Sequence, residues 1–474
     1  MNDVATAGSF LDRLAAIVGT RYVLTAEADK EPYLTEPREY YRGSASAVVK
    51  PGSAEEVSAI LRLANETGTP IVPQGGNTGL VGGQTPDESG REIVLSTERL
   101  DRIRAVDAAG GTIVTEAGVV LERLQAAAAE AGMLFPLSLG AEGSCRIGGN
   151  ISTNAGGTGV LAYGNTRNLV LGLEVVLPTG EIWNGLRGLV KDNSGYDLKQ
   201  LFIGAEGTLG IVTAAVLRLF PAPRGQAVAM AGVPDPEAAL RLFRTARDRA
   251  GTGLTAFELI PRILIDMLIT HLPDARDPLA GPHPWYVLLE LSSGRSEEDA
   301  TALVEGTLAE ALEAGTVSDA VVATSLEQAG QLWRLRHALS EIQKPEGASI
   351  KHDVSIAVER VPDFIARAGE AAVAAVPGSR PVAFGHVGDG NIHFNLSQPK
   401  GMKPEDFMAR APDVHAAVHA IVVEMGGSIA AEHGIGRYKR TLLPTVKSEI
   451  ELDMMRRIKR AFDPNSILNP GRVL

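Results

Sequence analysis

Glycine is concentrated in two stretches of this chain, and this clustering restricts the possible fold more than any other feature of the sequence. The 474 residues include 52 glycines, which gather between residues 75 and 83 and between residues 140 and 164. Glycine adopts backbone conformations that other residues avoid and places no side chain between the backbone and a neighbour. We therefore expect a fold in which two loops bring their backbone close to a ligand.

The composition is that of a globular protein with two or three domains. Apolar residues make up 45% of the chain and charged residues 22%. The net charge is −12 without a Lys/Arg-rich block, which argues against a nucleic-acid partner. Cys145 is the only cysteine, which excludes an intrachain disulfide and a cysteine-based metal site.

The beginning of the chain has the pattern of an amphipathic helix. The segment Met1–Gly19 carries Asp3 and Asp12 and lacks the basic and apolar regions of a signal peptide. No run approaches the roughly 18 apolar residues of a membrane span. We therefore expect a soluble, cytoplasmic protein, with peripheral membrane contact left open.

The pattern of apolar runs predicts a mixed α+β organisation. We expect a helical lead-in over 1–45, a first domain over 46–222, a second α+β domain over 223–425 and a C-terminal segment over 426–474. Ser53 is the expected N-cap of a helix over Ala54–Thr67. Other expected helices are Val120–Ala131, Pro236–Ala250, Ser296–Glu313 and Lys447–Phe462, and other expected strands are Pro70–Pro73, Ile93–Ser96, Thr112–Glu116, Leu169–Leu177, Val228–Gly232, Tyr286–Leu291 and Val321–Ala323.

The glycine loops suit a long ligand that has a diphosphate and a flat ring. The loop Gln74–Gly83 follows a short strand and exposes backbone N–H groups that can bind a pyrophosphate. It is neither a P-loop nor a GxGxxG fingerprint, and a cluster of surface turns is the alternative. The second loop Gly148–Gly157 favours the ligand, because it is too polar for a core and too uncharged for a linker, and the turn Gly204–Gly210 follows it in the same domain.

A predicted β-hairpin places two histidines together. Asp389-Gly390 is a strong signal for a two-residue turn, which would make His386 face His393. Opposed residues project from one face, and Asn395 lies two residues further on that face. Paired imidazoles are natural ligands of a borderline metal such as zinc. Two histidines in a half-exposed sheet are the alternative.

A third metal ligand would come from Glu432-His433, which precede Gly434 and Gly436. On a regular strand the two side chains would point to opposite faces, so both reach one site only where the backbone turns. The glycines favour such a turn. An ordinary surface turn is the alternative.

Positive charge for an acidic substrate is available on the predicted helix Trp333–Ser340. Arg336 and Ser340 lie four residues apart and would share a face, and Lys351 opens the following strand. A solvated helix face that carries Arg334 and Arg336 is the alternative.

The chain resembles the vanillyl-alcohol oxidase / p-cresol methylhydroxylase superfamily, and within it the branch that acts on D-2-hydroxy acids. The resemblance runs from about Tyr33 to Leu474. Its motifs are Pro73–Gly79, Gly148–Asn150, Asn154–Gly157, Gly204–Gly207 and Asn469–Gly471, in the expected order. It implies a two-subdomain FAD-binding domain, an α+β substrate or cap domain and a C-terminal helical segment that returns to the FAD site.

The resemblance also implies residue roles. His386, His393 and Glu432 would bind a divalent metal, with Zn²⁺ as the expected ion, and His433 would be the catalytic base. Arg336, Ser340, Lys351 and Asn395 would bind the substrate, although the family more often has Thr where this chain has Ser340. The residues implied for FAD are Pro73, Gln74, Gly75, Gly76, Asn77, Thr78, Gly79, Gly82, Pro136, Leu137, Gly140, Gly148, Gly149, Asn150, Ser152, Asn154, Gly156, Gly157, Glu206, Ile211 and Asn469.

The activity that the resemblance implies is FAD- and metal-dependent oxidation of a D-2-hydroxy acid. D-2-Hydroxyglutarate is the first expected substrate, and D-lactate, D-malate and glycolate are alternatives. No histidine precedes His271, so we expect noncovalent FAD. The expected electron acceptor is an electron-transfer flavoprotein or a quinone, and a homodimer is left open. A zinc hydrolase and a noncatalytic flavin electron-transfer subunit are the competing classes.

Overall fold

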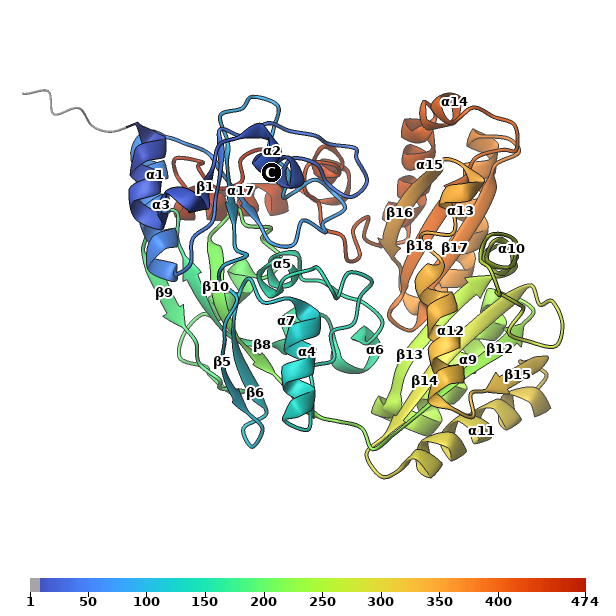
Figure 1. Ribbon diagram of the computed structural model, residues 1–474. Helices are drawn as coiled ribbons and strands as arrows, with labels where there is room; N and C mark the ends of the chain where they lie inside the picture. Colours follow the sequence, from blue (N-terminus) through green and yellow to red (C-terminus); the bar gives the residue numbers. More distant parts are fainter. Residues whose placement is uncertain (1–8) are drawn as a thin grey trace, which may run out of the picture. The chain divides into compact units, whose positions relative to one another are not determined.

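The computed structural model of the protein describes residues 9–474 and divides into two compact units (Figure 1). The first unit comprises the residues up to Gly156, Asn165–Pro221 and Glu432–Leu474. The second comprises Gly157–Gly164 and Ala222–Ala431. Within the described residues, no helix combines the length and the apolar character needed to span a membrane.

The first unit is built on two sheets. The first sheet has the order β1-β2-β4-β3, with β2, β3 and β4 parallel. The second is antiparallel, with the order β5-β6-β10-β8-β9. Their strands are β1 Val23–Leu24, β2 Ala47–Val49, β3 Ile71–Gln74, β4 Ile93–Ser96, β5 Ile103–Asp107, β6 Thr112–Glu116, β8 Val170–Val176, β9 Ile182–Gly185 and β10 Ile211–Arg218, and β7 Met133–Leu134 pairs with β11 Phe220–Pro221.

Helix α3, Ala54–Thr67, begins and ends where the sequence predicts. Ser53 caps it by accepting a hydrogen bond from the N–H of Glu56 at 3.2 Å, while the Glu56 carboxylate accepts from the N–H of Gly52. Its apolar face packs on the first sheet. The other helices of this unit are α1 Phe10–Val18, α2 Glu27–Lys30, α4 Leu121–Glu130, α5 Ile147–Thr153, α7 Thr166–Leu169, α8 Lys199–Phe202, α16 Leu443–Val446 and α17 Glu449–Phe462. The first residues of the predicted helix Met1–Gly19 lie outside the described residues.

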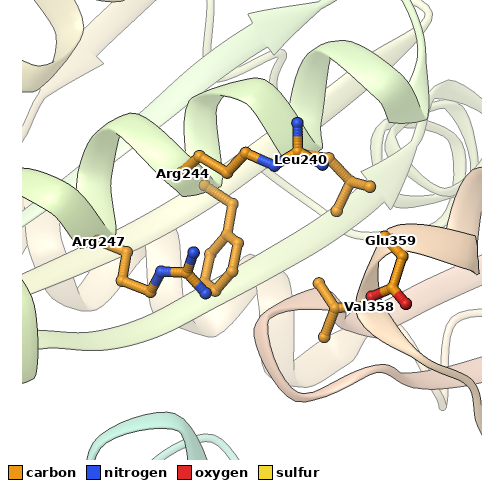
Figure 2. Close-up of a pocket in the computed structure, with 6 residues that line it drawn as sticks. Leu240, Arg244, Arg247, Val358 and Glu359 are labelled. Atoms are coloured by element: carbon orange, nitrogen blue, oxygen red, sulfur yellow. The ribbon is translucent and has the colours of Figure 1, made fainter.

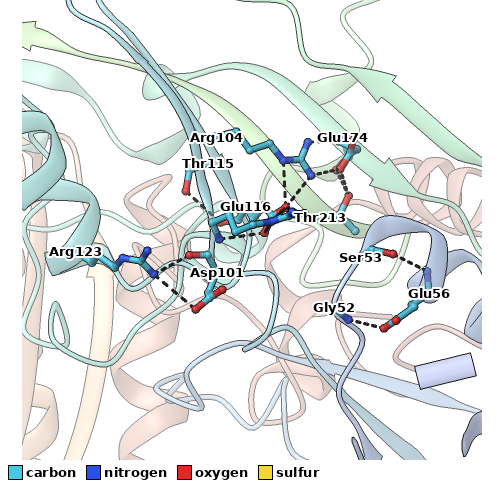
Figure 3. A network of polar contacts seen from close by, with 11 residues as sticks. Gly52, Ser53, Glu56, Asp101, Arg104, Thr115, Glu116, Arg123, Glu174 and Thr213 are labelled. Atoms are coloured by element: carbon cyan, nitrogen blue, oxygen red, sulfur yellow. Dashed lines mark hydrogen bonds and ion pairs between the residues drawn. The ribbon is translucent and has the colours of Figure 1, made fainter. Parts of the chain in front are cut away.

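A network of charged and polar side chains around the buried Glu116 ties four strands of the second sheet together (Figure 3). Glu116 on β6 is fully buried and binds Arg102 at 2.8 Å and Arg104 at 3.2 Å. Arg104 also binds Glu174 on β8 at 3.1 Å, and Glu174 accepts a hydrogen bond from Thr213 on β10. Burial alone would raise the pKa of Glu116, but the hydrogen bonds and charges of the arginines lower it.

The end of the chain returns to the first sheet. The N–H of Ile71 on β3 donates to the Ile467 carbonyl at 2.7 Å, and the N–H of Asn469 donates back to the Ile71 carbonyl at 2.8 Å. Arg472 forms a buried ion pair with Glu92. The C-terminal residues therefore extend a sheet formed almost 400 residues earlier in the chain.

The second unit is a seven-stranded antiparallel sheet of order β15-β12-β14-β13-β17-β18-β16. Helices α10 and α12 pack on one face, and α9, α11, α13 and α15 cover the other. The strands are β12 Gly225–Val233, β13 Leu254–Pro261, β14 Trp285–Ser293, β15 Asp319–Val322, β16 Ser349–Ser355, β17 Arg380–His386 and β18 Asn391–Ser397. The helices are α6 Val160–Tyr163, α9 Pro236–Ala250, α10 Arg262–His271, α11 Glu297–Glu313, α12 Leu326–Ala338, α13 Val361–Ala375, α14 Pro404–Met408 and α15 Ala411–Glu424.

Candidate active site and cofactor loops

One face of the second unit's sheet carries four of the polar residues expected at the site, namely Lys351, His386, His393 and Asn395. Strands β16, β17 and β18 are neighbours, and directly paired residues project from the same side of a sheet. Lys351 pairs with Asn395, and β13 brings a buried carboxylate to the same face. The polar residues that share this face include Glu258, Lys351, Asp353, His386, Asn391, His393 and Asn395.

The predicted register of the histidine hairpin is wrong, although its face is right. His386 pairs with Asn391 and not with His393. The connection contains a 3-10 turn, Val387–Asp389, followed by Gly390 with φ +80°, so it takes four residues instead of two. A shift of two residues keeps every side chain on its face, because side chains alternate with period two. The two imidazole rings accordingly lie 5.6 Å apart between centroids.

A buried carboxylate that the sequence reasoning missed holds His386 in place. Glu258 on β13 lies 2.5 Å from His386 Nδ1 and 2.7 Å from the Arg336 guanidinium. Burial alone would raise the pKa of Glu258, but Arg336 and His386 lower it to about 2. The ionised carboxylate can only accept, so His386 Nδ1 carries the proton and Nε2 is the nitrogen that can bind a metal.

The sequence contains a signal for Glu258. It is the one charged residue in the otherwise uncharged run Leu254–Pro261, all of which is buried. A carboxylate in such a strand needs a cationic partner, because burying an unpaired charge is costly. The single acid in this apolar run could therefore have predicted a buried carboxylate with a cationic partner.

Asp353 is the second acid that was missed. Its Oδ1 accepts a hydrogen bond from Asn391 Nδ2 at 3.0 Å and lies 4.0 Å from His393 Nδ1. Asp353 and His393 belong to a group of side chains whose ligand atoms lie within 4.8 Å of one another. This face thus offers imidazole and carboxylate donors, which are the donor types that zinc accepts.

Glu432 and His433 begin the last segment of the first unit. The predicted backbone turn is present, since Gly434 has φ +81° and Gly436 has φ +51°. The preceding residue, Ala431, belongs to the second unit and donates its N–H to the Asp353 carbonyl at 3.3 Å. The peptide chain therefore leaves the sheet edge at Asp353 one residue before Glu432.

Arg336 and Ser340 do not share a helix face as predicted. Helix α12 ends at Ala338, and Ser340 is exposed in the turn that follows. Gln343 Nε2 donates a hydrogen bond to the Leu339 carbonyl at 2.8 Å. This side-chain donor stabilises the turn that follows the helix. Arg336 is buried, so the alternative of a solvated helix face is wrong for this residue.

The first glycine loop packs directly against helix α5 of the second loop. A Cβ on Gly76 would lie 2.0 Å from the Ser144 carbonyl oxygen, and a Cβ on Gly75 would lie 3.7 Å from Gly149. Asn77, with φ +54°, donates to the carbonyls of residues 32 and 35. Gly76 is therefore required for the close approach of this loop to Ser144, whereas a Cβ on Gly75 would make only an ordinary van der Waals contact.

The third turn and the chain end join the same region. Glu206, with φ +51°, accepts backbone hydrogen bonds from Ile435 at 2.7 Å and Gly436 at 2.8 Å. Burial raises the pKa of Glu206 despite these donors. Asn469 Nδ2 donates to the Glu206 carbonyl at 2.8 Å and to the Gly83 carbonyl at 3.0 Å.

These loops have the features of a ligand cradle. Among the described residues, the side-chain oxygens Gln74 Oε1, Asn150 Oδ1 and Asn469 Oδ1 are buried without a hydrogen-bond partner. Buried polar atoms are normally satisfied, so their partners would be ligand atoms or water. All three residues are among those expected to bind FAD. Of the others, Pro73 lies on β3, residues 148–152 on α5 and Ile211 at the start of β10, while Gly157 belongs to the second unit.

A small pocket lies elsewhere in the second unit, between α9 and the 3-10 turn Val358–Arg360 (Figure 2). Its lining residues are Leu240, Phe243, Arg244, Arg247, Val358 and Glu359. None of the site residues expected from the sequence lines it, so it does not mark the candidate site.

Comparisons with protein families agree with this arrangement. Residues 45–185 match a family described as "FAD binding domain", and residues 222–473 match one described as "FAD linked oxidases, C-terminal domain". The chain is 39% identical over 449 residues to the D-2-hydroxyglutarate dehydrogenase of Xanthomonas citri pv. viticola. The matched region covers 95% of this chain and 93% of the relative. It is also 39% identical over 437 residues to the mitochondrial D-2-hydroxyglutarate dehydrogenase of Rattus norvegicus, covering 91% and 79%.

Solved structures confirm the expected fold class. The fold is similar to that of p-cresol methylhydroxylase, with a TM-score of 0.76 and 19% identity over 98% of this chain and 96% of the other. It is also similar to alkyldihydroxyacetonephosphate synthase, with a TM-score of 0.75 and 16% identity over 97% and 85%.

Proposed function

Because the chain belongs to the family of FAD-linked oxidases, we propose that it oxidises a D-2-hydroxy acid, with D-2-hydroxyglutarate as the first candidate. The observation that carries the proposal is the match to D-2-hydroxyglutarate dehydrogenases along nearly the whole chain. The polar sheet face adds the donors that activation of a hydroxyl group requires. FAD, when bound in the glycine loops, supplies the acceptor for the hydride from C2.

The residues of the sheet face fit a divalent metal. His386 Nδ1 donates to Glu258, which is the outer hydrogen bond that commonly fixes the tautomer of a metal-binding histidine. We assign His386, His393 and Glu432 as the metal ligands, with Asp353 as a further carboxylate beside His393. A metal there would polarise the substrate hydroxyl and chelate the adjacent carboxylate.

The proton of the substrate hydroxyl is assigned to His433. Oxidation removes a hydride from C2 and a proton from the hydroxyl oxygen, and a carbonyl forms between these two atoms. A neutral imidazole is a suitable acceptor of that proton near pH 7. Glu432 Oε1 lies 3.7 Å from His433 Nε2, so the proposed base lies next to a proposed metal ligand.

The substrate carboxylates are assigned to Arg336, Ser340, Lys351 and Asn395. Lys351 and Asn395 are direct partners across β16 and β18, so their side chains leave the sheet together. Asn395 Nδ2 donates to Gln343 Oε1 at 3.0 Å, which orients its amide group. A second cationic group would favour a dicarboxylate over a monocarboxylate substrate.

A flavin-bleaching panel tests the proposal. The purified protein, loaded with FAD, is mixed anaerobically with D-2-hydroxyglutarate, D-malate, D-lactate or glycolate, and its visible spectrum is recorded. We expect D-2-hydroxyglutarate to bleach the flavin fastest, with loss of bleaching after chelation and recovery with Zn²⁺. Absence of bleaching by all four acids would contradict the proposal.

The side chains available in the first unit indicate how FAD is attached. The only histidine of the first unit is His433, and Cys145 is buried. We therefore propose noncovalent FAD, with an electron-transfer flavoprotein or a quinone as the later acceptor. Acid precipitation should leave the flavin in the supernatant, and flavin in the pellet would contradict noncovalent binding.

A further inference from the structure

Three histidines lie together on the opposite face of the second unit's sheet. His352 is on β16, and His415 and His419 are on α15. Successive residues of a strand point to opposite faces, so His352 points away from the face that carries Lys351 and Asp353. Within the second unit, helices α13 and α15 lie side by side over this face (Figure 1). The cluster is therefore separate from the candidate active site.

The helix presents its two histidines to the strand as a pair. His415 and His419 are four residues apart and hence on one side of α15. Their rings are nearly parallel, at 15° with centroids 5.7 Å apart. The His352 ring stands nearly perpendicular to both, with centroids 4.7 Å and 5.3 Å away. The three imidazoles thus surround one point between the helix and the sheet.

The hydrogen bonds of His352 fix which nitrogen it offers. Its Nδ1 lies 2.9 Å from the Phe394 carbonyl oxygen, which can only accept, so Nδ1 carries the proton. In the neutral ring Nε2 then holds a lone pair, and it lies 2.9 Å from His415 Nδ1. Two ring nitrogens this close must share a proton or a cation, because their lone pairs otherwise repel each other.

The surroundings favour a cation. His352 and His419 are buried, and His415 is half-buried, so the cluster lies at the edge of the packed interior. One ligand atom from each of the three histidines lies within 4.8 Å of the others. A backbone carbonyl that accepts from the far nitrogen is the usual outer contact of a histidine that binds a metal.

We propose that His352, His415 and His419 form a second metal site, for a divalent transition metal with the preferences of Zn²⁺. Three imidazoles and one water molecule complete a tetrahedral set. The site would clamp α15 to β16 and thereby stabilise the unit that carries the substrate face. This inference does not rest on the proposed function, because its residues lie on the other side of the sheet.

Zinc binding to single-histidine variants of the full chain tests the site. The FAD-loaded protein is stripped with a chelator, and Zn²⁺ binding is measured by calorimetry and by elemental analysis after gel filtration. The test variants are His415→Ala and His419→Asn. His393→Ala removes a ligand of the other candidate site, and His271→Ala is the matched control, since it removes an imidazole that instead pairs with Glu346.

We expect His415→Ala and His419→Asn each to lose one zinc per chain or to bind it at least about tenfold more weakly, since changes even to outer contacts cost 10–100-fold. His393→Ala and His271→Ala should retain this ion. Zn²⁺ should also raise the Tm of His393→Ala but not that of the double variant His393→Ala/His415→Ala. Equal zinc content and affinity in His415→Ala, His419→Asn and His271→Ala would overturn the proposal, as would a wild-type chain that binds no zinc. The zinc counts are independent of whether any hydroxy acid is oxidised.

Discussion

Glu258 shows how much one buried side chain can organise. It accepts from both Arg336 and His386, which come from a helix and from a neighbouring strand. Through these contacts one carboxylate fixes the tautomer of a proposed metal ligand and neutralises a cation beside it.

Glu258→Gln should destabilise the second unit in a pH-dependent way. Removing one partner of a buried ion pair costs about 3–5 kcal/mol. The pKa of Glu258 is about 2 in the folded chain, below its ordinary value of 4.5, so its contribution is present above pH 4.5 and disappears as the pH falls toward 2. Urea unfolding should give a difference of roughly 3 kcal/mol at pH 7 that shrinks through this window.

Glu290→Gln is the matched control for that experiment. Burial raises the pKa of Glu290, which has hydrogen bonds from Thr255 and Trp333 but no ion pair with any described residue. Its carboxylate therefore destabilises the fold as the pH rises, so the sign of the pH dependence is opposite. If the free energy of unfolding changed with pH in the same direction in both variants, the stabilising interaction of Glu258 with Arg336 and His386 would be contradicted.

Arg336→Ala should harm a dicarboxylate substrate more than a monocarboxylate. Loss of a buried charge partner costs about 2–5 kcal/mol of binding, and D-lactate lacks the second carboxylate. Steady-state kcat/KM with D-2-hydroxyglutarate and D-lactate measures the difference. Arg334→Ala, two residues away on α12 and exposed, is the control. Equal losses for both substrates would assign Arg336 to holding Glu258 and not to the distal carboxylate.

At the scale of elements, contacts between loops decide which glycines are essential. Gly76 lies in the first loop against the Ser144 carbonyl, whereas Gly149 lies within α5. Both belong to the expected FAD residues, and their sequence motifs do not distinguish their roles. The difference is steric and comes only from the folded chain.

Gly76→Ala and Gly149→Ala should therefore behave differently. A Cβ on Gly76 would lie 2.0 Å from a backbone oxygen, so the loop must move and both stability and FAD binding should fall. A Cβ on Gly149 meets no described atom within 4 Å, and alanine favours a helix by about 1 kcal/mol. We expect Gly149→Ala to keep its Tm but to bind FAD more weakly, as measured by flavin fluorescence. Unchanged FAD affinity in Gly149→Ala would place the flavin away from α5.

At the scale of the whole molecule, the end of the chain completes the first unit. Asn469 connects the first glycine loop with the Glu206 turn, and its neighbours add to β3. These contacts join residues up to 386 positions apart in the sequence, so the first unit depends on its last segment as well as on its first.

Asn469→Ala should cost about 1–3 kcal/mol, since it leaves the part-buried Gly83 carbonyl and the buried Glu206 carbonyl without this donor. FAD affinity should fall with it. Asn465→Ala is the control, because Asn465 joins Asn65 by a comparable long-range hydrogen bond on the surface. Its effect should stay within about 0.5 kcal/mol. Similar losses of stability and FAD in both variants would contradict the special role of the buried amide.

The sequence by itself determined the elements whose signals are local. Capping and periodicity predicted α3 and α9 with their bounds, and the period of β6 was equally clear. The glycine motifs predicted the loops, and the resemblance that they carry predicted the fold class. Such features depend on interactions between residues within a few positions of one another, so they can be predicted from the sequence without knowledge of the fold.

Tertiary structure alone decided the register and the buried partners. The turn Val387–Asp389 shifted the histidine hairpin by two residues, and the early end of α12 removed Ser340 from the face of Arg336. Glu258 came to His386 from a strand 128 residues away. These outcomes depend on which segments pack together in space, and the free energies of such contacts are not contained in any local pattern of residues.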